Sequence, residues 1–126
     1  MKQSESSVQA EVRLECARRG ILLFRNNSGA FKDDTGRVIR FGLGNDSAQT
    51  NSVMKSSDLI GIQAVTITPD MVGQTVGVMH AYECKAPGWR LTPGDKRGQA
   101  QLVFLNLVRS RGGVAAFVTC VEDIPI

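Results

Sequence analysis

The sequence predicts one α/β domain with a mixed β-sheet, and three observations support this fold class. The chain has 126 residues, the size of one compact domain, and 42% of them are hydrophobic, enough to form a core. One segment near each end of the chain has the apolar spacing and end signals of a helix. Short apolar runs, too brief for helices, alternate with turn residues elsewhere. Neither repeats nor linkers interrupt residues 1–126, so we expect a single domain.

The N-terminal segment is expected to be a helix over residues 4–19. Ser4 and Ser7 are both suitable N-caps, because a serine side chain accepts a hydrogen bond from a free amide of the first turn. Val8 and Cys16 are two steps of four residues apart, with another valine between them, which gives one apolar stripe along the helix. A glycine follows at the expected end.

Residues 21–41 are expected to form a strand, a polar turn and a hairpin. The run at 21–24 is apolar and too short for a helix, and polar residues follow it at 25–29. Two further short runs flank Asp33-Asp34-Thr35-Gly36, a sequence that favours the turn of a β-hairpin. Residues 42–57 are rich in Gly, Asn and Ser, so we expect them to be the least structured part of the chain.

The C-terminal half continues the alternation of strands and helices. A turn or a short helical turn is expected to begin at Thr68. Thr92 is the expected N-cap of the last helix, with Pro93 at its first position and its end near Arg111, before two glycines. The remaining strands are short apolar runs, and they are expected at residues 58–62, 75–85 and 114–119.

The charge of the chain is compatible with a polyanionic partner but does not by itself establish one. The formal net charge is +3 and the isoelectric point is about 9.0. We expect neither a signal peptide nor a membrane span, because the chain has no apolar run of the required length.

The three cysteines, Cys16, Cys84 and Cys120, are expected to be reduced. An odd number without paired spacing argues against a disulfide framework or a zinc site. Each cysteine is expected to be a small core residue. A reducing cytoplasm is the compartment that suits such a chain.

Glu83 and Lys85 are the first candidates for chemistry. Side chains alternate between the two faces of a strand, so these two residues share a face with Ala81, while His80 lies on the other face and is expected to be structural. The pair therefore stands at the end of an otherwise apolar strand face. Alone, it is also compatible with an ordinary solvated strand end.

Asp58 strengthens the catalytic interpretation. It precedes the apolar run at 59–62 and so stands at the start of a second strand. If the two strands are neighbours, Asp58 and Glu83 can share a cation, and carboxylates are the ligands that Mg²⁺ and Mn²⁺ prefer. Lys85 would then orient a water molecule or offset charge on a phosphate. The alternative for Asp58 is a cap at a turn or strand start.

Two helical side chains are further candidates. Gln101 shares the apolar face of the last helix, where a buried amide needs a partner, either in the site or at a backbone carbonyl. Glu5 lies one turn before Val8 on the stripe of the first helix and can reach a metal site, whereas Glu11 and Glu15 belong more to the polar face. Which of these glutamates joins the site stays open.

At this point the chain resembles the PD-(D/E)XK nuclease superfamily, and most closely its VRR-NUC branch of small stand-alone phage-type proteins. The Glu-x-Lys element is weak alone, but the ordered set is fairly specific and covers nearly the whole chain. Ser57 stands where the family pattern has a proline, a change that the branch tolerates. The resembling stretches are Glu5-x-x-Val8-Gln9, Arg25-Asn26-Asn27-Ser28-Gly29, Ser57-Asp58-Leu59-Ile60-Gly61, Glu83-Cys84-Lys85, Gln101-x-x-Phe104-Leu105 and Gly112-Gly113.

The resemblance implies a restriction-endonuclease-like core, a mixed central sheet flanked by helices, over residues 1–126. It implies phosphodiester hydrolysis of DNA with Mg²⁺ or Mn²⁺. By position, Asp58 and Glu83 would be metal ligands, Lys85 the catalytic lysine, Gln101 the helix glutamine and Glu5 the N-terminal acid, a catalytic residue that also binds the metal.

The resemblance also implies a homodimer that acts on branched DNA such as Holliday junctions, in the cytoplasm of a bacterium or of a host cell if the chain is phage-encoded. Among the polar residues outside the site, Arg25, Asn27, Arg90 and Arg97 are the expected DNA contacts, because basic loops give salt-sensitive binding to phosphates. The competing hypothesis is a nucleic-acid-binding module on a nuclease-like fold, without catalysis. An unrelated small-molecule enzyme has less support, because no cofactor loop is present.

Overall fold

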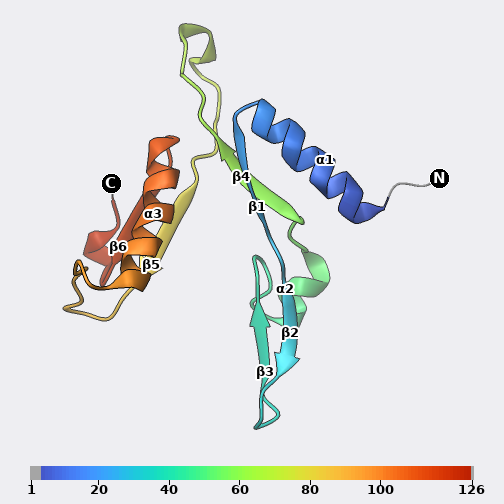
Figure 1. Ribbon diagram of the computed structural model, residues 1–126, viewed down its shortest axis with the longest axis vertical. Coiled ribbons are helices and arrows are strands. Elements are labelled where there is room, and N and C mark those ends of the chain that lie inside the picture. The colour runs from blue at the N-terminus through green and yellow to red at the C-terminus, as the bar shows by residue number, and fades with distance from the viewer. Residues whose placement is uncertain (1–3, 126) are drawn as a thin grey trace. The chain divides into compact units, whose positions relative to one another are not determined.

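The computed structural model describes residues 4–125 and has a mixed α/β architecture. The chain divides into two compact units, the first ending at Gly61 and the second beginning at Ile62, and each is described by itself. Within the described residues the strands form three two-stranded sheets, β1–β4, β2–β3 and β5–β6 (Figure 1). The general α/β class expected from the sequence is therefore confirmed, but the described strands do not form the single mixed sheet that was expected.

The first unit opens with helix α1 (Glu5–Arg18), close to the expected bounds. Ser4 is its N-cap, because the Ser4 hydroxyl accepts a hydrogen bond of 3.1 Å from the Ser7 amide. No residue of α1 is buried, and Val8 and Val12 on the apolar stripe remain 44% and 42% exposed. The helix packs against the strand that follows it.

Strand β1 (Ile21–Arg25) pairs with β4 (Leu59–Gln63), and both strands form where the apolar runs predicted them. The end of β1 lies beside the start of β4, since the Asn26 amide donates to the Asp58 carbonyl oxygen at 2.8 Å. Gly61 is required in this pair, because a Cβ there would collide with the carbonyl oxygen of Leu22.

The expected hairpin forms from β2 (Gly29–Lys32) and β3 (Val38–Phe41), which pair antiparallel with Gly29 opposite Phe41. Its turn is held by Asp33. One Asp33 carboxylate oxygen accepts hydrogen bonds from the Thr35 amide at 2.9 Å, the Thr35 hydroxyl at 2.6 Å and the Arg37 amide at 2.9 Å. These bonds stabilise the charged carboxylate and hold its pKa below the ordinary value, with the Thr35 hydroxyl as the largest cause.

The segment 42–57 was expected to be irregular, and that expectation is wrong over six residues. Helix α2 (Ala48–Val53) forms there, capped by the Ser47 hydroxyl, which accepts a hydrogen bond of 3.1 Å from the Thr50 amide. The helix is short and has no apolar period, so its sequence carries little signal. Before it lies Asn45, a polar residue that is only 4% exposed.

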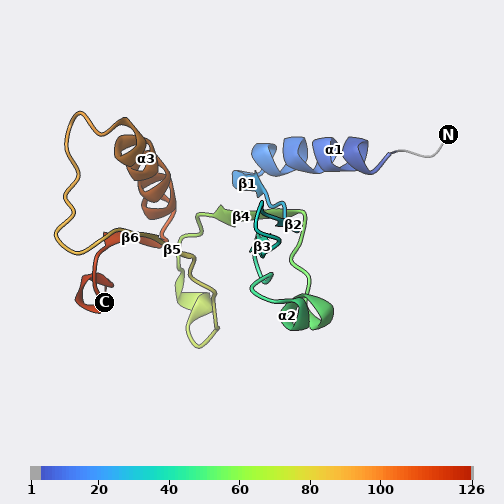
Figure 2. The ribbon, with the colours of Figure 1, turned by 90° about the horizontal axis from the view of Figure 1, so that it is seen from below.

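The second unit contains a β–α–β arrangement of β5 (His80–Cys84), α3 (Lys96–Ser110) and β6 (Val114–Val118). Strands β5 and β6 are parallel, with Glu83 opposite Phe117. Helix α3 lies on one face of this pair (Figure 2). The small core between helix and strands comprises Leu105, Val108 and Ala115, against which Met79, Ala81 and Phe117 pack.

Strand β5 is shorter than the predicted strand at 75–85. Residues 74–79 have no regular strand pairing, and Val76 and Val78 are 53% and 52% exposed. The physical reason is the partner: β6 has five residues and therefore pairs with only five residues of β5. The turn expected from Thr68 is confirmed as a short 3₁₀ helix, Pro69–Met71.

The prediction of Thr92 as the N-cap of the last helix is wrong. The Thr92 carbonyl instead accepts from the Asp95 amide at 3.1 Å and closes a turn that contains Pro93. Asp95 is the N-cap, because its carboxylate accepts a hydrogen bond of 2.9 Å from the Gly98 amide. Gly98 is buried, and a Cβ there would collide with the Asp95 carboxylate and Leu91.

The cysteines also depart from expectation. Cys84 and Cys120 are exposed and Cys16 is half-buried, so none of them is a core residue; all three are free. Cys84 is exposed because it lies on the face of β5 that points away from α3. On that face the His80 ring nitrogen lies 2.5 Å from the Tyr82 hydroxyl, a structural contact as expected for His80.

A short turn held by a carboxylate follows the last strand. The 3₁₀ helix Val121–Asp123 follows β6, and the Asp123 carboxylate accepts from the amide and hydroxyl of Thr119, each at 2.8 Å. Among the helices of residues 4–125, none is long and apolar enough to cross a lipid bilayer.

We expect the Asp33 carboxyl to titrate below its ordinary pKa and Thr35→Val to move the titration upward, because the variant loses the largest hydrogen bond to the carboxylate. Since the folded pKa is lowered, the contribution of Asp33 to stability is present above the unfolded-state pKa and is lost as the pH falls through the folded one. Carboxyl ¹³C NMR against pH measures the midpoint. An equal midpoint in both proteins would show that the Thr35 hydroxyl does not stabilise the Asp33 carboxylate.

Asp95→Ala is expected to lower the free energy of unfolding by about 1 kcal/mol, because the Gly98 amide loses its acceptor. Urea denaturation followed by circular dichroism measures the change. Thr92→Ala is the matched control and should have a smaller effect, since the Thr92 backbone carbonyl is retained. The reverse order of the two effects would restore Thr92 as the cap.

Candidate active site

Three of the predicted site residues meet at the end of β5. The Gln101 side-chain amide of α3 donates to the Glu83 Oε1 atom at 2.9 Å. The Lys85 Nζ atom lies 3.8 Å from the same oxygen, so the carboxylate stands between an amide and an ammonium group. This contact is the partner that an amide on an apolar helix face requires, and it is a site residue rather than a backbone carbonyl.

The β–α–β packing explains why these side chains converge. Glu83 follows Ala81 on the face of β5 that α3 covers, because side chains alternate along the strand. The Lys85 amide donates to the Val118 carbonyl at 2.9 Å, which continues the pairing with β6 and fixes the lysine backbone. Gln101 lies one helical turn before the buried Leu105 and therefore faces the strands.

A tight turn brings Trp89 back against Lys85. Pro87 and the positive φ of Gly88 (83°) allow the turn that the hydrogen bond from the Trp89 amide to the Ala86 carbonyl closes at 3.1 Å. The Lys85 ammonium lies 5.1 Å from the centre of the Trp89 ring, a cation–π contact. The Lys85 side chain is only 18% exposed, because it is held between the carboxylate and the indole.

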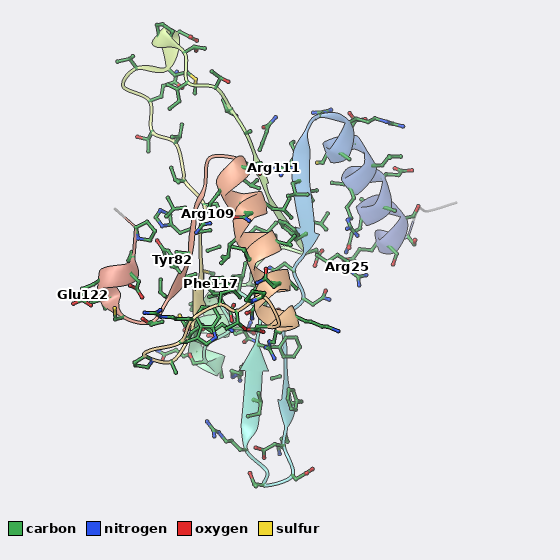
Figure 3. The ribbon with its side chains drawn as sticks, turned by 60° about the vertical axis from the view of Figure 1, so that its left-hand side comes forward. Arg25, Tyr82, Arg109, Arg111, Phe117 and Glu122 are labelled. Carbon is green, nitrogen blue, oxygen red and sulfur yellow. The ribbon has the colours of Figure 1, made fainter. Side chains whose placement is uncertain are left out.

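The Trp89 ring packs against a second aromatic ring, that of Phe117. Its centre lies 4.7 Å from that of Phe117, at an interplanar angle of 45°. Phe117 belongs to β6 and packs on the core, as its position beside α3 in Figure 3 illustrates. Trp89 is therefore a residue that positions Lys85.

A hollow of about 410 Å³ adjoins the cluster. Its walls are mainly apolar, and Glu83, Gln101 and Arg97 are its charged and amide groups. The Gln101 Oε1 atom is buried and has no hydrogen-bond partner within the described residues. A carboxylate that is 37% exposed and an unpartnered amide oxygen are both hard donors, of the kind that Mg²⁺ or Mn²⁺ binds.

The other predicted metal ligands belong to the first unit. Asp58 is an exposed residue directly before β4, and its backbone carbonyl, not its carboxylate, is used in the pairing with Asn26. Glu5 is exposed in the first turn of α1. The structure thus describes these two carboxylates separately from Glu83, and it groups no three His, Cys, Asp or Glu side chains within residues 4–125.

Asn26 is a residue that the sequence analysis missed. Its side-chain amide donates to the Ser57 carbonyl at 2.7 Å and to the Ser56 hydroxyl at 3.0 Å, which fixes the chain just before Asp58. The available signal was the position of an asparagine directly after an apolar strand, where its side chain can bind backbone groups. Asn26 therefore positions Asp58 without touching its carboxylate.

The predicted DNA contacts are all exposed, but only one adjoins the Glu83 cluster. Arg97, in the first turn of α3, lines the hollow beside Gln101. Arg90 lies in the loop before α3. Arg25 ends β1 and, with Asn27, flanks Asn26 in the first unit (Figure 3). Gln99 has a separate role, because its amide donates to the Thr92 carbonyl at 3.0 Å.

We expect chemical acetylation to modify Lys85 more slowly than Lys96, because Lys85 is enclosed by Glu83 and Trp89 whereas Lys96 is exposed on α3. Trp89→Leu should raise the Lys85 rate several-fold and leave the Lys96 rate unchanged. Quantitative mass spectrometry of both sites provides the measurement. Equal rates for the two lysines in the unaltered protein would contradict the enclosed position of Lys85.

The chain matches no protein-family model, no curated protein and no solved structure among those compared. A proposal for its function therefore depends on the residues of the site and on the order of these residues along the chain, which resembles that of the nuclease pattern.

Proposed function

We propose that this chain is a divalent-metal-dependent DNA endonuclease that hydrolyses phosphodiester bonds in branched DNA such as Holliday junctions. The observation that supports it most is the cluster of Glu83, Lys85 and Gln101, held together by hydrogen bonding and charge at a strand end. In this proposal the two units belong to one restriction-endonuclease-like domain of the VRR-NUC type.

The proposed metal ligands are Glu83 and Asp58, with Glu5 as the acid of the N-terminal helix. The donors present fit Mg²⁺ or Mn²⁺, since Glu83 is a partly exposed carboxylate and the Gln101 oxygen lacks a partner. When bound, the ion would polarise the scissile phosphate and lower the pKa of a bound water. Asn26, which fixes the segment before Asp58, would keep that carboxylate in position.

Lys85 is the proposed catalytic cation. Its ammonium is held by the carboxylate and the Trp89 ring, so it need not be ordered during the reaction. There it would offset the negative charge that grows on the phosphate and orient the attacking water. Gln101 keeps the Glu83 carboxylate in one orientation, and Arg97 at the hollow would contact a backbone phosphate.

The surroundings of Lys85 favour an enzyme over a module that only binds DNA. A lysine that merely binds phosphate works best with its charge exposed and no acid beside it. Lys85 is instead mostly enclosed and paired with Glu83, a carboxylate that would repel a phosphate. That repulsion disappears only when a cation lies between them, which is the requirement of metal-dependent hydrolysis.

The proposed substrate contacts and the proposed assembly involve further residues and a second copy of the chain. Arg25, Asn27 and Arg90, all exposed, would contact the DNA backbone without reading its sequence. A two-fold homodimer would place two identical sites on a symmetrical four-way junction. A monomer would suit flaps or ends, so the measured mass and the substrate preference should agree.

Lys85→Met, Glu83→Gln and Asp58→Asn should each reduce cleavage of a four-way junction by at least about 100-fold, because each removes a group that acts on the transition state. The assay compares junction, duplex and single-stranded DNA with Mn²⁺, with Mg²⁺ and with a chelator. Circular dichroism and thermal melting verify that each variant is folded.

Lys96→Met is the matched control, because Lys96 is exposed on α3 and does not line the hollow. It should cleave like the unaltered protein. Undiminished metal-dependent cleavage by folded Lys85→Met would refute the assignment of the catalytic lysine. Tight DNA binding with no cleavage under any metal would establish the binding module instead.

A further inference from the structure

A second polar hollow, of about 330 Å³, lies in the first unit between the hairpin and the segment after α2. It is separate from the Glu83 cluster and contains two cations, Arg40 and Lys55. Its lining has no carboxylate. Its residues are Ser28, Gly29, Ala30, Arg40, Asn45, Asn51, Lys55 and Ser56.

Arg40 is fixed in this hollow by a buried amide. The Arg40 Nη1 atom donates to the Asn45 Oδ1 atom at 3.1 Å. Asn45 is 4% exposed and is itself held, because its side-chain nitrogen donates to the carbonyls of Gly29 and Phe41 at 2.7 and 3.0 Å. The guanidinium is thus oriented by the hairpin backbone and retains donors for a ligand.

Lys55 is oriented in a similar way from the other side. Its Nζ atom donates to the Asn51 Oδ1 atom at 2.7 Å, one helical turn earlier in the chain. Ser56, next to it, receives the Asn26 amide at its hydroxyl oxygen, and that hydroxyl hydrogen remains available. Lysine, asparagine and serine therefore contribute polar groups to one wall.

These two cations differ from the paired arginines of the first helix in the partners that hold them. Their bonds go to neutral amide oxygens, and neither residue forms an ion pair in the part of the chain between residues 4 and 125. By contrast, Arg18 and Arg19 of α1 both pair with Glu15. Two oriented cations without an acid are a suitable site for an anion with several acceptor oxygens.

We propose that this hollow binds a backbone phosphate of DNA, away from the bond that is cut. The inference depends on the proposed function for the identity of the polymer. Arg40 would contact two phosphate oxygens through its planar fork, and Lys55 would supply the second charge. Contacts of this kind position a duplex but do not read its bases.

The test is the salt dependence of DNA binding by the full chain, in a chelator so that no cleavage occurs. Lys55→Met should weaken binding to a mixed-sequence duplex. It should also reduce the magnitude of the negative slope of log affinity against log salt by about 0.9, the value for one lost phosphate contact. Lys55→Arg, which keeps the charge, should restore the slope. Arg13→Met removes an exposed charge from α1 of the same unit and should leave the slope unchanged.

The outcomes separate this inference from the nuclease proposal. An unchanged slope in folded Lys55→Met, equal to that of Arg13→Met, would overturn the phosphate site even if the protein cuts DNA. A slope of smaller magnitude would support it even if Lys85→Met still cleaves. Amide NMR shifts at Asn51 and Ser56 with inorganic phosphate alone, together with an unchanged DNA slope, would also overturn it by showing a site for the free anion.

Discussion

The hydrogen bond between Gln101 and Glu83 is the interaction on which the site depends. It exists because an amide on the buried face of α3 must find a partner, and the strand end supplies a carboxylate. The same helical face buries Leu105 one turn later, so the position of the carboxylate is set by the packing of the small core. Lys85 then pairs with Glu83 and rests on Trp89. The positions of these three side chains therefore depend on the packing of the β–α–β unit.

The two hollows differ in their charged groups, and this difference suggests a division of roles. Beside the Glu83 cluster, acid and lysine balance each other, and a phosphate can approach the acid only when a further cation is present. In the first unit, Arg40 and Lys55 have no acid, so a phosphate is attracted without any ion. Binding and cleavage of a DNA strand would accordingly depend on different side chains, with different responses to salt and to metal.

The sequence predicted those features that local rules determine. Asp33 and the glycine that ends its turn identified the hairpin, and the alternation along β5 correctly put Glu83 and Lys85 on one face. Prediction from the sequence failed where tertiary contacts determine the local structure. Thr92 was the predicted cap, but Asp95 caps the helix, where its carboxylate accepts from the amide of the buried Gly98. The length of β5 was set by its partner strand, and α2 has no period. The roles of Trp89 and Asn26 could not be predicted from local patterns. Trp89 reaches Lys85 through a tight turn, and Asn26 binds a segment about 30 residues later in the chain.

The most direct test of the central claim is a Mn²⁺ titration followed by the fluorescence of Trp89, the single tryptophan of the chain, which lies against Lys85. If Glu83 and Asp58 hold the ion, the fluorescence should change on binding, and Glu83→Gln and Asp58→Asn should each weaken the affinity by about tenfold or more, while Lys96→Met keeps it. Unaltered Mn²⁺ affinity in both folded acid variants would contradict the account.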